Sequence, residues 1–350
     1  MIKKHLYVLK SPQYVIGLFL LVLVIVARNI GMDLATLFND SLIKFSMNGI
    51  FVLSLLPMLN SGMGMNFGMP VGVVAGLIGL CIAVNYNIVG VSGIIVSMVL
   101  GCLVAVFFGI VYGRILLGVS GREEIAGTFI GYSFIPIMNF FWTLAPFSNR
   151  QMLYPIGGSG LRPRIGLNAY FGKVIDNSLY LSIGDIGLPM GMLLVYVLIG
   201  GFLIFFYRTS IGKAMLAVGE NPNFAKASGM DCDRLKKISV CFSLALGAIG
   251  ICVYAQSFGF IELYDAPMTI AFPAVSALLI GGATANKGTV LQGVVGTYLF
   301  QSIYLLSVPI ANELLLPEVS EIMRTIIANG IILYALLMSH QRRNLYGASL

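Results

Sequence analysis

Long uncharged apolar runs constrain this chain more than any other feature of its sequence, and VIGLFLLVLVIVA at 15–27 is a clear example. Lipid offers no water to backbone groups, so only helices or closed barrels span it. Barrel strands alternate apolar and polar residues, whereas these runs are apolar on every side. The composition agrees, because 10% of residues are charged against about 25% in soluble domains. The sequence therefore predicts an all-α polytopic membrane protein, with 1–350 forming a single transmembrane domain.

A membrane helix needs about 20 predominantly apolar residues, and the runs predict about ten such spans. The expected spans are 12–30, 43–59, 70–88, 91–117, 125–144, 187–207, 238–258, 267–282, 289–307 and 322–339. An even number of spans places both termini on the same side of the membrane. Because the ends MIKKH and HQRRN are basic, that side is predicted to be the cytoplasm.

The charges of the longer loops fit this orientation. The basic loop 208–237 is expected in the cytoplasm, whereas the acidic segments 259–266 and 308–321 are expected outside. Segment 145–186 is rich in Gly, Pro and aromatic residues, and we expect it to form a folded external cap. The same bias accounts for the net charge of +7, so no nucleic-acid partner is expected.

The middle of the expected spans contains no Asp, Glu or His, the residues on which proton-coupled transport depends. All fourteen Asp and Glu residues are expected in loops or at span ends, and the histidines are His5 and His340. This weakens a proton-coupled mechanism, although a Na⁺ site built from backbone carbonyls remains open. No catalytic set, metal-ligand cluster or phosphate-binding loop is recognisable. No catalytic residue, metal or cofactor is therefore expected in this chain.

The segment NSGMGMNFGMP at 60–70 interrupts an apolar region, which predicts a discontinuous helix. Pro70 suits a first helical turn, so a helix should begin near Met69, preceded by non-helical backbone over 60–66. Such backbone is tolerated in a membrane where it is buried in protein or lines a wet cavity. Two interpretations of the segment 60–70 remain open: it lines the translocation path, or it is an ordinary inward-facing turn, re-entrant or not.

Neutral amides and glycines inside the spans provide the candidate path and packing residues. Amides can donate and accept hydrogen bonds without carrying charge, although they also link helices to one another for about 0.6 kcal/mol each. The candidates for the solute path are Asn60, Asn66, Gly68, Asn85, Asn139, Gln256, Gln292, Gln301 and Asn329. The candidates for close helix packing are Gly68, Gly72, Gly76, Gly281 and Gly282.

The loop 208–237 contains the signals of a short capped helix. Asn221 suits the N-cap, Pro222 the first helical position and Gly229 the left-handed C-terminal position. These residues predict a helix over 222–228 outside the membrane. A simple connector and a docking element remain equally open on this ground alone.

Two stretches resemble motifs of one transporter family. GKAMLAVGENPNFAKASGMD (212–231) resembles the cytoplasmic coupling loop of permease subunits of bacterial ATP-binding-cassette importers for ribose-type sugars, nucleosides and branched-chain amino acids. ALLIGGATANKGTVLQGVVGTYLFQSI (277–303) resembles that family's glycine-rich second motif, and the likeness extends over roughly 45–340. The resemblance implies a coupling element that docks on the ATPase subunit. Its residues would be Gly219, Glu220, Asn221, Pro222, Ala225, Ala227 and Gly229.

The resemblance also implies partners and a location. A cytoplasmic ATPase subunit would hold ATP and Mg²⁺, a second permease subunit would complete the path, and an external solute-binding protein would deliver the solute. The location would be the bacterial cytoplasmic membrane, in contact with its lipid. MNFGMPVG at 65–72 resembles the nucleoside-type more than the ribose-type pattern, with Pro70 where an acid would stand, so we expect a simple sugar or a nucleoside. The alternatives are a stand-alone secondary transporter and a non-transporting scaffold.

Overall fold

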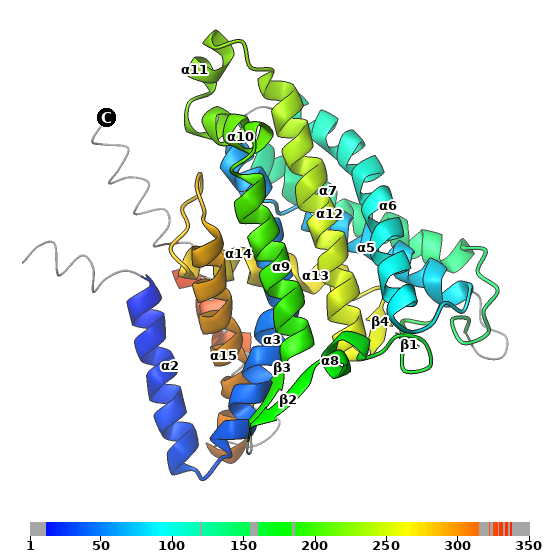
Figure 1. Ribbon diagram of the computed structural model, residues 1–350, viewed down its shortest axis with the longest axis vertical. Helices are drawn as coiled ribbons and strands as arrows, with labels where there is room; N and C mark the ends of the chain where they lie inside the picture. The colour runs from blue at the N-terminus through cyan, green and yellow to red at the C-terminus, as the bar shows by residue number, and fades with distance from the viewer. Residues whose placement is uncertain are drawn as a thin grey trace, which may run out of the picture.

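The structure is a computed structural model that describes residues 12–119, 121–154, 160–183 and 186–314, together with positions 322, 325–327, 329–331, 333–334 and 337. Most of the long helices run roughly along the long axis of an elongated bundle, and the few short strands gather near one end (Figure 1). The N-terminal helices are α2 (Pro12–Asn29), α3 (Leu34–Ser54), α4 (Leu56–Met58), the π-helical turn η1 (Leu59–Met63), α5 (Met69–Asn85), α6 (Gly90–Gly118) and α7 (Glu123–Leu144). The later helices are α8 (Val174–Ser178), α9 (Met190–Phe206), α10 (Ser210–Glu220), α11 (Pro222–Ala227), α12 (Cys232–Phe258), α13 (Ala266–Thr269), α14 (Ala271–Ile280) and α15 (Val290–Leu314).

Six helices of the described chain are long and apolar enough to cross a membrane. A seventh is added if α9 and α10, which meet at 76°, count as one span. This is fewer than the ten spans expected, because α5 has 17 residues and α14 has ten. The tenth expected span, 322–339, and both chain ends lie largely outside the described residues.

The largest boundary difference concerns α3. We expected this span to begin at 43, but the helix begins at Leu34 because the Asp33 carboxylate caps it, accepting hydrogen bonds from the backbone N–H groups of Ala35 and Thr36. Together α3, α4 and η1 form a continuous run of 30 residues, Leu34–Met63. Asp40 therefore lies within a helix, where we had expected a loop or a span end.

The centre of the bundle is α5, which is buried over 14 of its 17 residues. It packs between α6 and α12 through backbone-close contacts at glycines. A Cβ added at Gly72 would lie 2.7 Å from the Leu244 carbonyl oxygen, and one at Gly76 would lie 2.5 Å from that of Ala248, both on α12. Small residues allow this approach where helices pack in lipid.

Four short strands lie at one end of the bundle (Figure 1). β1 (Arg164–Gly166) pairs antiparallel with β4 (Phe260–Glu262) in the register Ile165–Ile261, and an ion pair of 3.0 Å joins Arg164 to Glu262. β2 (Tyr180–Ile183) pairs with β3 (Ile186–Pro189). The described parts of segment 145–186 therefore contain β1, α8 and β2, all at this end, which we name the cap face.

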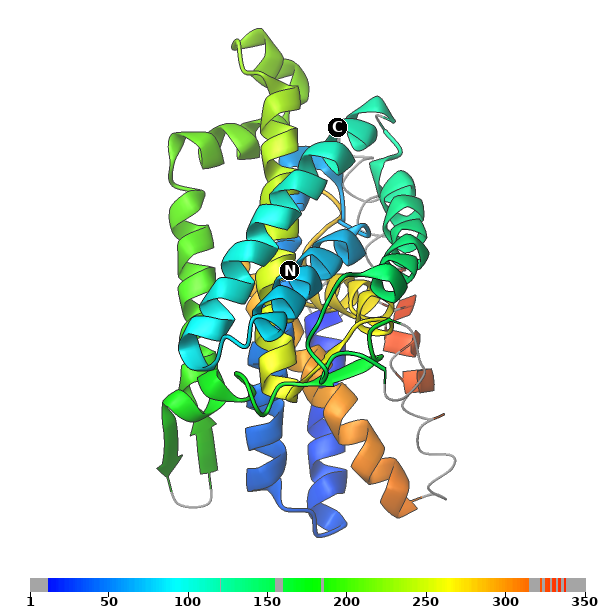
Figure 2. The ribbon, with the colours of Figure 1, turned by 90° about the vertical axis from the view of Figure 1, so that its right-hand side faces the viewer.

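The opposite end, which we name the coupling face, carries η1, α10, α11 and the loop 281–289. Figures 1 and 2 show α11 projecting from this end beyond the rest of the bundle. The loop 281–289 contacts both η1 and the end of α10 through hydrogen bonds. Segments that are far apart in the sequence are thus gathered at one end of the molecule.

Candidate functional site

The interruption predicted at 60–70 is present, and it has a defined local geometry. We name residues 59–68 the break. The preceding helix ends as the turn η1, where Gly62 has φ of +78°, and Gly64 follows with φ of +78°. α5 begins at Met69, the residue predicted, with Pro70 in its first turn. The open backbone is less extensive than the predicted 60–66, because η1 continues the helix to Met63 with a non-helical kink at Gly62, and 64–68 lie outside any helix.

Protein groups on three helices satisfy the polar groups of the break. The backbone N–H of Met65 donates to Oε1 of Glu124, in the first turn of α7, at 2.8 Å. The Asn66 amide donates to Oγ of Ser243 on α12 at 2.8 Å, and the Tyr112 hydroxyl on α6 donates to Asn66 Oδ1 at 3.4 Å. Asn66 is 1% exposed. The break is therefore largely buried in protein, which is one of the two environments in which a membrane tolerates non-helical backbone, although Gly62 is exposed.

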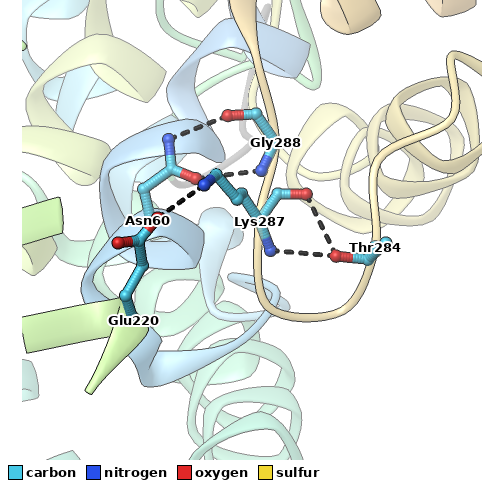
Figure 3. A network of polar contacts seen from close by, with 5 residues as sticks. All are labelled: Asn60, Glu220, Thr284, Lys287 and Gly288. Carbon is cyan, nitrogen blue, oxygen red and sulfur yellow. Dashed lines mark hydrogen bonds and ion pairs between the residues drawn. The ribbon is translucent and has the colours of Figure 1, made fainter. Parts of the chain in front are cut away.

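Asn60 joins the break to the loop 281–289. Its Nδ2 donates to the carbonyl of Gly288 at 2.9 Å, and its Oδ1 accepts from the N–H of Gly288 at 2.9 Å (Figure 3). The preceding residue, Lys287, donates to Glu220 Oε1 at 2.5 Å, and its main chain is held by Thr284. The hydrogen bond and charge of Lys287 lower the pKa of the Glu220 carboxyl below its ordinary value. Two of the sequence motifs thus meet at this point.

The end of α10 packs against the break with no side chain between them. A Cβ added at Gly219 would overlap the Asn60 carbonyl oxygen and lie 2.9 Å from its carbon. Beside this contact, the hydroxyls of Ser61 and Ser239 are 2.7 Å apart, which ties the break to α12 as well. The break, α10 and the loop 281–289 therefore form one junction at the coupling face.

The short helix predicted over 222–228 is present as α11. The Asn221 side chain accepts a hydrogen bond from the N–H of Phe224 at 3.0 Å, and Pro222 occupies the first turn. Gly229, with φ of +78°, terminates the helix. Ala225 is buried, whereas Phe224 is 63% exposed on this projecting element. Phe224 was not singled out from the sequence, where a phenylalanine in a loop carries no distinguishing signal.

The other predicted path residues are dispersed rather than brought together. Gln256 accepts from the N–H of Ile175 and donates to Asp176, while Asn85 accepts from the N–H groups of Ser148 and Asn149. Both amides therefore hold segments of the cap face in place. Gly68 precedes α5 and faces the Tyr112 ring, Asn139 Oδ1 is buried without a hydrogen-bond partner in the described chain, and Asn329 is exposed.

Gln292 and the glycines at 281 and 282 shape the loop next to the junction. Gln292 and Thr289 form a reciprocal capping box at the start of α15. The Gln292 amide also donates to the Gly282 carbonyl at 3.0 Å. A Cβ at Gly281 would overlap the Gln292 carbonyl oxygen, and Gly282 has φ of +94°. These residues fix the path of the loop that contacts Asn60.

Gln301 lines a cavity of about 160 Å³ inside the bundle. Its walls come from α3, α12, α13, α14 and α15, and its polar lining includes Lys44, Asn48 and two tyrosines, Tyr254 and Tyr304. The Lys44 ammonium lies 4.8 Å from the centre of the Phe258 ring. Sequence reasoning did not single out Lys44 because the expected span 43–59 placed it at a helix end. It lies ten residues into α3, about 15 Å along the helix axis.

Comparison with known proteins identifies the family to which this chain belongs. The family model described as "Branched-chain amino acid transport system / permease component" matches residues 37–337. The chain belongs to this family. The resemblance seen in the coupling-loop and glycine-rich motifs is thereby confirmed, and we refer to the chain below as the permease. No solved structure matches it.

Three curated relatives show which members of the family the permease resembles. It is 26% identical to the xylose transport system permease protein XylH of Haemophilus influenzae, over 69% of this chain and 62% of that protein. It is 28% identical to the nucleoside ABC transporter permease protein NupB of Lactococcus lactis, over 54% and 50% respectively. The autoinducer 2 import system permease protein LsrC of Yersinia enterocolitica is 24% identical, over 37% and 35%. The permease thus spans less than two thirds of each relative's length.

Proposed function

We propose that the permease is the membrane subunit of an ATP-binding-cassette importer for a small polar solute, a simple sugar or a nucleoside, in the bacterial cytoplasmic membrane. Its family membership supports a role in transport, and the names of its relatives, which include xylose and nucleoside permeases, support these solute classes. About ten spans with both termini in the cytoplasm form part of this proposal. In it, ATP and Mg²⁺ bind to a partner subunit, and the permease contributes no catalytic residue.

The single observation that carries the proposal is the junction at the coupling face. In an importer, ATP-driven movement must pass from a cytoplasmic ATPase to the membrane path. Here α11 projects from the bundle, and the adjoining end of α10 meets the break through Gly219 and Asn60. A push on α11 would therefore reach a discontinuous helix directly. The capped ends of α11 stiffen it, and the exposed Phe224 ring is suited to fill an apolar pocket on the ATPase.

We assign the solute path to the cavity beside Gln301. Amides and an ammonium group offer donors and acceptors for hydroxyls, and the rings of Phe51 and Tyr254 provide apolar faces against a sugar ring. Asn66 and the other dispersed amides would then hold the helices rather than contact the solute. A second permease subunit would complete the path, and a solute-binding protein would dock on the cap face.

A mild-detergent purification of the tagged permease from its own cells tests this proposal. We expect an ATPase with a phosphate-binding loop to co-purify in stoichiometric amount, and to be lost from the Phe224→Asp variant. Leu181→Asp, at a similarly exposed position on the cap face, should retain it. Recovery of the permease alone, together with ATP-independent uptake in liposomes, would instead establish the secondary transporter.

A further inference from the structure

A groove of about 580 Å³ opens on the outer surface of the bundle between α6, α9 and α12. These three helices lie side by side in Figure 1. The groove is separate from the junction and from the cavity beside Gln301. Its lining is apolar except for two basic side chains at one end. The apolar residues are Val106, Ile110, Phe202, Phe206, Ile238, Cys241, Phe242 and Ala245, and the basic ones are Arg234 and Lys237.

The floor of the groove is a single stripe of α12. From Arg234 to Ala245 its residues recur at spacings of three and four, which places them on one helix face. The stripe starts with the two basic residues at the coupling face and is apolar thereafter. Its 11-residue rise corresponds to about 16 Å, roughly half of the 30 Å hydrocarbon core. The groove is therefore about as long as one leaflet of the hydrocarbon core is thick.

The walls repeat this pattern. Val106 and Ile110 are four residues apart on α6, and Phe202 and Phe206 are four residues apart on α9. The Phe206 and Phe242 rings meet with centroids 4.7 Å apart, and this contact joins α9 to α12. The groove therefore has apolar residues on all three helices, which suits an extended hydrocarbon chain.

The basic end of the groove makes no ion pair within the described chain, although Asp231 caps α12 and Asp233 lies in its first turn. Among the described residues the ion pairs are Arg164–Glu262 and Lys287–Glu220, and neither involves Arg234 or Lys237. Basic residues at helix ends commonly extend toward water. These two, however, also line the groove, at the end nearest the coupling face.

We propose that this groove binds an anionic phospholipid of the leaflet at the coupling face. One acyl chain lies along the apolar stripe, and the phosphate sits between Arg234 and Lys237. Basic pockets between membrane helices recognise anionic headgroups in this way. A second copy of the permease is a poorer occupant. A two-fold axis along the membrane normal would bring four like charges together at one depth, which is unfavourable.

The bound lipid would also support the coupling element. Phe206 is the last residue of α9, and α10 begins at Ser210, after a connection of three residues, at 76° to α9. An acyl chain between α9 and α12 therefore props the corner that positions α10 against the break. Removal of the lipid would loosen this corner while leaving the junction residues unchanged.

Native mass spectrometry of the purified, delipidated permease with its co-purifying subunits tests the inference. Phosphatidylglycerol and phosphatidylcholine with the same acyl chains are titrated in parallel. We expect phosphatidylglycerol to bind more tightly, and the double variant Arg234→Gln/Lys237→Gln to lose about 30-fold of that affinity. The basic control Arg122→Gln, exposed before α7, should bind as the wild type does, and Arg234→Lys should retain most of the affinity.

Two further measurements distinguish a bound lipid from an interface between two copies of the permease. Ala245→Phe fills the groove without a change of charge and should weaken binding of both lipids. Equal binding of the two lipids by the wild type, or equal behaviour of the double variant and Arg122→Gln, would overturn the proposal. Oxidative cross-linking of two permease copies through Cys241 in native membranes would also overturn it, because the surface would then be a subunit interface.

Discussion

The contact between α10 and the break makes Gly219 the most informative single position in the permease. The substitution Gly219→Ala adds one methyl group where the Asn60 carbonyl carbon lies 2.9 Å away and the Gly62 nitrogen 3.1 Å away. Ordinary contacts of a Cβ begin at 3.4 Å. Both neighbours are backbone atoms, so no flexible side chain can move aside. Because the Asn60 carbonyl oxygen lies nearer still and would overlap the added methyl group, the end of α10 must retreat by about an ångström.

This displacement has a cost and a functional consequence. Forcing an extra methyl group into a packed site costs about 1–3 kcal/mol, so the thermal midpoint should fall. The larger effect should be on coupling, because the retreat separates the coupling element from Asn60 and Gly62. We expect solute uptake by the intact complex to fall several-fold while the ATPase subunit still co-purifies.

The assay compares uptake in proteoliposomes, ATP hydrolysis and the thermal midpoint for Gly219→Ala and Gly118→Ala. Gly118 ends α6 on the same side, and a Cβ there meets nothing within 4 Å. The control should match the wild type in all three measurements. If Gly219→Ala behaved like Gly118→Ala, close packing at this contact would play no part in coupling and the reasoning would fail.

Three other substitutions test separate parts of the structure. Asn60→Leu leaves the buried N–H and carbonyl of Gly288 without hydrogen-bond partners, at a cost of about 1–3 kcal/mol per group. The thermal midpoint of this variant should therefore fall well below that of Asn329→Leu, a matched change at an exposed position. Equal midpoints would contradict this. Glu220→Gln should cost less than about 1 kcal/mol, because the pair with Lys287 is exposed. Lys287 lowers the pKa of the Glu220 carboxyl, so the small stabilisation is present above the ordinary pKa of a glutamate and is lost as pH falls through the lowered pKa. If the thermal midpoint of Glu220→Gln kept the acid dependence of the wild type, this ion pair would not be its source. Gln301→Leu should reduce uptake without loss of the ATPase subunit, and unchanged uptake would remove the cavity from the path.

Local signals in the sequence were sufficient where the structure depends on local contacts. The caps of α11 follow from Asn221 and Gly229, whose hydrogen bonds and backbone angles involve residues within four positions. The start of α5 follows in the same way from Pro70. In these segments the residue type and its neighbours determine the geometry, so a pattern read along the chain predicts it correctly.

Contacts between distant residues could not be predicted from one sequence. Nothing in the pattern indicates that Glu124 would accept from Met65, 59 positions earlier, or that Asn60 would bind Gly288, 228 positions later. The start of α3 was placed too late because the segment before position 43, which contains Asn39 and Asp40, does not resemble a lipid-facing helix. Lys44 is accommodated because it faces an internal cavity rather than lipid.

Contacts between distant residues also explain why the amide candidates for the solute path lie in different parts of the structure. Asn85 and Gln301 are both amides at membrane depth in the sequence, yet one holds backbone groups near Asn149 and the other lines a cavity. An amide serves either purpose equally well, and its neighbours in space decide which. Only the packed arrangement of α3, α12 and α15 around Gln301 distinguishes it from the rest.

The hydrogen bonds of the break depend on residues late in the sequence, which has a consequence for the biosynthesis of the permease. The ribosome delivers Asn60, Met65 and Asn66 to the membrane before it has synthesised Glu124, Ser243 or Gly288, on which their hydrogen bonds depend. Until α12 and the loop 281–289 emerge, the insertion machinery must shelter a discontinuous helix whose polar groups lack their final partners. A nascent chain stalled before Gly288 should therefore remain a substrate for membrane quality-control proteases, even though most of its helices are already inserted.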